Sequence, residues 1–82
     1  MTQPSMLDSA PNLDHLKPLT QRVAGLFVSR PGVWISMHEL ARVGGTGGWR
    51  TRVSEARDAL GTIDNRQREQ DGYRVSEYRW VP

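Results

Sequence analysis

The chain has 82 residues, a formal net charge of +2 and no cysteine. This length predicts a single small domain with a thin core. The lack of cysteine excludes a disulfide framework and a thiolate metal site, and two histidines are too few for a protein-only zinc site. No apolar run approaches the length of a membrane span, and the first residues lack the basic-then-apolar pattern of a signal peptide. We therefore expect a cytoplasmic protein that does not enter a membrane.

The first eighteen residues contain three prolines and show little hydrophobic periodicity. This composition predicts a flexible or loosely docked tail over residues 1–18. Leu13 and Leu16 could form a short turn against the core. A partner-binding arm is the functional alternative, but the prolines favour disorder.

Residues 19–29 are predicted to form the first helix, because their apolar side chains recur on one helical face. Thr20 is its expected N-cap, and a Pro-Gly pair stops it. A short β-prone run follows at Val33–Ile35. In a flat strand only one of Trp34 and Ile35 can face the core.

Ser36 is expected to open a second helix. It has capping-box spacing to Glu39, so its hydroxyl can accept from the third helical amide while the glutamate reaches back. The helix should end at the glycine pair 44–45. A third helix is predicted over Trp49–Leu60, with Gly61 as its stop. Two short helices joined by a tight glycine turn form a helix-turn-helix pattern.

Beyond this helix the hydrophobic period changes to two. Residues 63–68 and 73–81 read as two strands joined through residues 69–72, where Asp-Gly is a strong hairpin-turn signal. The alternation of apolar residues switches near Ser76–Glu77, which predicts a bulge or an altered face there.

This order of elements is that of an α+β winged helix-turn-helix domain. It would consist of three helices and a small antiparallel sheet, with the C-terminal β-hairpin as the wing. We expect residues 19–82 to form this domain and the short strand to pair with the hairpin. The predicted core consists of Val23, Leu26, Phe27, one of Trp34 and Ile35, Leu40, Trp49, Val53, Leu60, Ile63, Val75 and Trp80.

Four stretches carry more specific motifs. They are Pro31–Ser36, Glu39–Arg42, Gly48–Glu55 with its Trp-Arg-Thr-Arg-Val-Ser sequence, and Ser76–Arg79. Together they resemble small winged helix-turn-helix proteins of bacteria and their phages, over residues 19–82. The resemblance implies a DNA-binding domain, often a regulatory one. Members of the wider fold class serve repression, excision and recombination, or only protein contacts.

Arginine is concentrated around the third helix. Ten of the eleven basic residues are arginines, and four of these lie between residues 42 and 57, against one acid, Glu55. The planar guanidinium suits bidentate contact with phosphate or guanine. GC-rich coding also favours arginine, so the cluster is more informative than the total. Within the helix, Arg52 is the cation nearest to Glu55.

These residues predict a DNA-reading face. Arg50, Ser54 and Arg57 recur at helical spacing, with Thr51 and Arg52 beside them. We expect this helix in the major groove and the hairpin at the minor groove or flanking backbone. The predicted DNA-binding residues are Arg50, Thr51, Arg52, Ser54, Arg57, Arg66 and Arg68. Dimerisation or cooperative loading on DNA is expected to supply affinity that one small domain lacks.

Other functions stay open. The arginines could form a solvated helix face and ordinary edge-strand charge. The modest net charge and the acids Glu69 and Asp71 at the hairpin tip favour a protein-interaction module, such as a phage-encoded binder of a host protein. Exposed tryptophan could instead bind single-stranded nucleic acid.

An enzyme is not expected, since no nucleophile-base-acid set, carboxylate pair or metal-ligand spacing is present. We therefore predict no cofactor and no metal. The predicted partner is double-stranded DNA, in the nucleoid of the cytoplasm or in a host cytoplasm if the chain is phage-encoded. Transcription regulation and a recombination or architectural role are both compatible with these residues.

Overall fold

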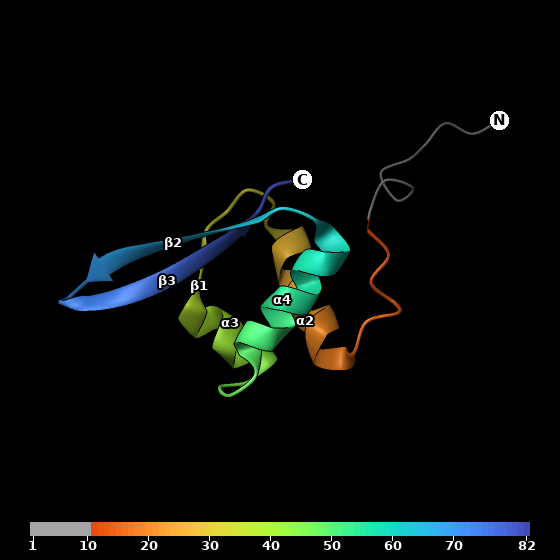
Figure 1. Cartoon of the computed structure of the whole chain (residues 1–82), viewed down its shortest axis with the longest axis horizontal. Coiled ribbons are helices and arrows are strands. Elements are labelled where there is room, and N and C mark those ends of the chain that lie inside the picture. The colour runs from red at the N-terminus through yellow and green to blue at the C-terminus, as the bar shows by residue number, and fades with distance from the viewer. Residues whose placement is uncertain (1–10) are drawn as a thin grey trace.

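The computed structural model describes residues 11–82 as a small α+β domain, with three helices and a three-stranded antiparallel sheet in the order β1-β3-β2. Figure 1 shows the helices gathered beside the base of the sheet, from which the β2–β3 hairpin extends. The elements are α2 (Pro18–Ser29), β1 (Ile35–Ser36), α3 (Met37–Gly44), α4 (Trp49–Leu60), β2 (Ile63–Gln70) and β3 (Tyr73–Trp80). Residues 1–10 of the predicted tail lie outside the described residues.

Helix α2 begins one residue earlier than predicted, and its N-cap is Lys17. The prediction of Thr20 as N-cap is wrong, because Pro18 occupies the first turn, where its fixed φ and missing N–H are tolerated. Thr20 instead lies buried within the helix. The predicted turn before it is confirmed. Leu13 and Leu16 pack against the core, and the Leu16 amide donates to the Leu13 carbonyl at 3.1 Å.

Strand β1 is shorter than predicted and shifted toward Ser36. Its pairing with β3 places Ile35 opposite Tyr78. Ile35 is only 1% exposed, so it is the inward-facing residue of the two candidates. Trp34 is only partly buried and lies outside the core cluster.

Only one of the two hydrogen bonds of the predicted capping box is present at the start of α3. The Ser36 hydroxyl accepts from the Glu39 amide at 3.2 Å. The Glu39 carboxylate does not return the bond but pairs with Arg30 at 2.7 Å. The helix ends at Gly44, and Gly45 follows with a φ of 97°, a conformation that favours glycine.

The hairpin pairs without interruption from Ile63 opposite Trp80 to Gln70 opposite Tyr73. The bulge predicted near Ser76–Glu77 is therefore absent. The second predicted alternative, a change in the face that the apolar side chains occupy within a regular strand, is correct. The connection is a two-residue turn, tighter than predicted. Asp71 and Gly72 have φ values of 54° and 82°, as a type I′ turn requires.

One buried cluster joins all three helices to the sheet. It contains most of the predicted core together with two alanines that were not predicted, Ala24 and Ala56. Leu26 and Leu60 are only partly buried against it, and Val75 is buried outside it. Along residues 11–82, each helix is too short or too polar to cross a bilayer.

Candidate functional site

Helix α4 has one buried side and one exposed side. Trp49, Val53 and Ala56 are buried, and the Trp49 ring meets Tyr78 of β3 edge to face, with centroids 5.8 Å apart. These contacts fix how the helix is rotated about its axis. The exposed residues on its outer side are Arg50, Thr51, Ser54, Arg57 and Asp58. Four of the seven predicted DNA-binding residues therefore share one surface, which we call the α4 face.

The two arginines of the α4 face are partly held in place. The Arg50 guanidinium lies over the Trp49 ring, 4.6 Å from its centroid, in cation–π contact. Arg57 donates from Nη2 to the Ile63 carbonyl at 3.1 Å, which ties the end of α4 to the start of β2. Both side chains remain exposed and keep donors for a ligand.

Arg52 lies apart from the α4 face. Its side chain is 19% exposed, and its Nε is 2.9 Å from Oε1 of Glu55, an ion pair that lacks hydrogen-bond geometry. Glu55 also accepts from the Thr20 hydroxyl and lies 3.5 Å from Nζ of Lys17. The predicted proximity of Arg52 and Glu55 is thus confirmed, and it turns Arg52 toward α2.

The surroundings of Glu55 favour its charged form. The hydrogen bond from the Thr20 hydroxyl is the main cause that lowers the pKa of this carboxyl, and the positive charges of Arg52 and Lys17 lower it further. Partial burial opposes them. The Thr20 hydrogen bond and the Lys17 ion pair connect the start of α2 to Glu55 of α4.

The hairpin carries a second group of arginines. Tyr78 and Trp80 of β3 contact the helical core, and successive residues of a strand point to opposite faces. Glu77 and Arg79 therefore point away from the helices, as do their cross-strand partners Arg66 and Asp64. We call this surface the outer sheet face. Its central residues are Trp34, Asp64, Arg66, Arg68, Glu77 and Arg79.

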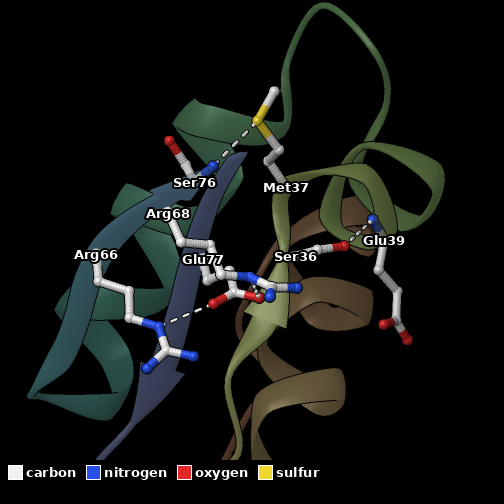
Figure 2. A network of polar contacts seen from close by, with 7 residues as sticks. All are labelled: Ser36, Met37, Glu39, Arg66, Arg68, Ser76 and Glu77. Atoms are coloured by element: carbon white, nitrogen blue, oxygen red, sulfur yellow. Dashed lines mark hydrogen bonds and ion pairs between the residues drawn. The ribbon is translucent and has the colours of Figure 1, made fainter. Parts of the chain in front are cut away.

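Glu77 is the buried centre of the outer sheet face, with a side chain only 7% exposed. Its Oε1 accepts from Nε of Arg66 at 2.8 Å, and its Oε2 accepts from Nε of Arg68 at 3.0 Å. Figure 2 shows both arginines converging on this carboxylate from β2. Sequence reasoning missed Glu77, although the Asp-Gly turn sets a register that places it opposite Arg66.

Trp34 is enclosed by two arginines. The guanidinium carbons of Arg66 and Arg79 lie 4.2 Å and 4.6 Å from its ring centroid. Arg79 also approaches Asp64 at 3.4 Å. Both guanidiniums are therefore within cation–π distance of the Trp34 ring.

Both surfaces carry exposed arginine side chains. Among residues 11–82, no group of three His, Asp or Glu side chains could hold a metal ion. Comparison of the chain with models of protein families, with curated proteins and with solved structures finds no significant match.

Proposed function

We propose that the chain is a winged helix-turn-helix protein that binds double-stranded DNA in a sequence-specific manner. The observation that carries this proposal is the α4 face, on which Arg50, Ser54 and Arg57 are exposed together. Helix α4 would enter the major groove and the β2–β3 hairpin would act as the wing. Such a protein would serve as a small transcriptional regulator or a recombination factor in the cytoplasm.

The packing of α4 supports this orientation. A major groove is about 12 Å wide and admits one helix, provided that the outer side of the helix is free. Trp49 and Val53 hold the inner side in the core. Figure 1 shows the turn at residues 45–48 at its lower edge, between α3 and the start of α4. Recognition helices commonly contact bases from their N-terminal half.

The hairpin supports a wing. It spans eight residues in each strand and reaches beyond the helices. Arg66 and Arg68 lie on its outer sheet face and are roughly half exposed. A single domain of this size makes few base contacts, so a homodimer or cooperative loading would provide useful affinity.

The test begins with a selection of duplexes from a random-sequence library, which returns the preferred site. Titration of the selected duplex should then show that Arg50→Ala weakens binding by about 1–3 kcal/mol, the cost of losing one base-reading arginine. Arg22→Ala is the matched control, since Arg22 is an exposed arginine on α2 and removes the same charge. Equal loss in both variants would contradict reading by the α4 face.

One group of contacts favours a second candidate, a protein-interaction module on the same fold. Arg66, Arg68 and Arg79 each engage an acidic side chain, which reduces the positive field of the hairpin. Tyr73 near the tip is 75% exposed and could anchor a protein contact. DNA binding should weaken steeply with salt. If no duplex binds even at low salt, this second function replaces the first.

A further inference from the structure

The two arginines held by Glu77 use only some of their hydrogen-bond donors. The carboxylate accepts from Nε of Arg66 and from Nε of Arg68, one oxygen for each. Within residues 11–82, the terminal Nη groups of both side chains make no hydrogen bond. Each guanidinium therefore keeps its distal donors, and each side chain is about half exposed.

The same contacts preorganise these donors before a ligand binds. Free arginine side chains lose considerable rotamer freedom on binding a ligand. Here Glu77 is buried and lies opposite Arg66 in the strand register, so its position is set by the sheet. Trp34 supports the Arg66 guanidinium through cation–π contact. A ligand would meet two guanidiniums that are already ordered.

The spacing and charge of this pair indicate its ligand. Arg66 and Arg68 are two residues apart on β2 and so lie on the same face of the sheet. Their guanidiniums are held by the two oxygens of one carboxylate, which brings their remaining donors together. Two positive charges against the one negative charge of Glu77 leave a local charge of +1. Guanidinium N–H pairs match phosphate oxygens better than a point charge does.

We propose that Arg66 and Arg68 bind the phosphates of a nucleic-acid backbone on the outer sheet face, with Glu77 as their positioning residue. This inference rests on the proposed DNA-binding function, which already includes Arg66 and Arg68, and adds to it the phosphate as their ligand and Glu77 as the residue that positions them. Glu77 contacts no phosphate itself. Its role is to hold the two Nε groups so that the Nη groups face outward.

If Glu77 positions the two arginines, removing its charge should weaken DNA binding, whereas simple electrostatics predicts that it should strengthen binding. Removing an acidic residue normally strengthens DNA binding, because it removes repulsion from the phosphates. Glu77→Gln removes the negative charge but leaves one side-chain oxygen for two arginines. We expect this variant to bind the selected duplex about threefold or more weakly, since one guanidinium loses its partner.

The variant Arg66→Lys/Arg68→Lys tests the same idea on exposed positions. It preserves net charge but has no Nε that Glu77 can hold and no guanidinium fork. Binding should again weaken, and the slope of log Kd against log salt should fall by about one for each phosphate that the variant no longer binds. Arg74→Lys is the control, because Arg74 is an exposed arginine of β3 on the opposite face of the sheet and is not held by Glu77.

Fluorescence titration and thermal unfolding of each variant decide the outcome. Tighter or unchanged binding by Glu77→Gln, or by the double lysine variant, would overturn the site. If Arg50→Ala still weakens binding in that case, the proposed function survives without the second site. Failure of the wild-type chain to bind any duplex at low salt overturns both. If Glu77→Gln does not fold, the double lysine variant decides alone.

Discussion

Glu55 links α2 to α4 at the level of single side chains, since it contacts Thr20 and Lys17 of one region and Arg52 of the other. Glu77 does the same for the two strands of the hairpin through Arg66 and Arg68. Each glutamate determines which way its arginines point. Arg50, which contacts no carboxylate within residues 11–82, is the arginine most available to a ligand on the α4 face.

The lowered pKa of Glu55 predicts a pH-dependent stability. A carboxyl whose folded pKa lies below its ordinary value of 4.5 stabilises the fold above that pH. This contribution disappears as the pH falls through the folded pKa. We expect Glu55→Gln to lower Tm at neutral pH, with a difference from wild type that narrows in acid below pH 4.5.

Thermal unfolding followed by circular dichroism across this range measures the effect. Thr20→Val should also weaken the pH dependence, because the Thr20 hydroxyl is the main cause of the lowered pKa. A difference between wild type and Glu55→Gln that stays constant with pH would contradict this account.

At the scale of elements, the close approach of α3 to α2 depends on Gly44. This glycine is buried inside α3, and a Cβ atom added to it would lie 2.8 Å from Cγ2 of Val23 and 3.4 Å from the Trp49 Cα. Val23 is itself fully buried and branched, so it has little room to move. Gly44 thus allows α3 to pack closely against α2.

Gly44→Ala is therefore expected to destabilise the fold. Overpacking costs about 1–3 kcal/mol, and the gain in helix propensity returns at most about 1 kcal/mol. Urea unfolding should show a net loss of stability. Gly47→Ala is the matched control, since a Cβ there meets no atom within 4 Å. Equal stabilities of the two variants would show that Val23 yields to the added methyl.

Within residues 11–82, one buried core is shared by every helix and strand. Phe27 of α2, Ile35 of β1, Leu40 of α3, Val53 of α4 and Trp80 of β3 belong to the same buried cluster. The hairpin tip lies beyond it, but its strands are paired continuously to the core at Trp80. No group of helices or strands in this domain therefore has a separate core that could stay folded alone.

We therefore expect two-state unfolding. The three tryptophans report on different regions: Trp34 on the outer sheet face, Trp49 on α4 and Trp80 on the base of the hairpin. Tryptophan fluorescence and far-ultraviolet circular dichroism should give the same midpoint. An earlier fluorescence transition that Trp34→Phe removes would instead show that the sheet opens separately from the helices.

The sequence by itself determined the features that depend on neighbouring residues. The bounds of α4, the Ser36 cap of α3 and the Asp71–Gly72 turn are all confirmed, because periodicity, capping and positive φ are local properties of the chain. The α+β class and the strand pairing followed from the order of these elements. The seven residues predicted to bind DNA and the winged-helix assignment stay predictions.

Only the tertiary structure decided which side chains contact residues of other helices and strands. The pattern left Trp34 and Ile35 equivalent, and pairing with β3 turned Ile35 inward. Helical spacing placed Arg52 beside Arg50 and Ser54, but its side chain is only 19% exposed and pairs with Glu55. Glu55 in turn accepts a hydrogen bond from Thr20 of α2. The Asp-Gly turn sets the register that places Glu77 opposite Arg66, but the burial of its side chain and its two ion pairs are decided by packing across the sheet. Such contacts depend on packing between distant segments, which hydrophobic periodicity does not encode.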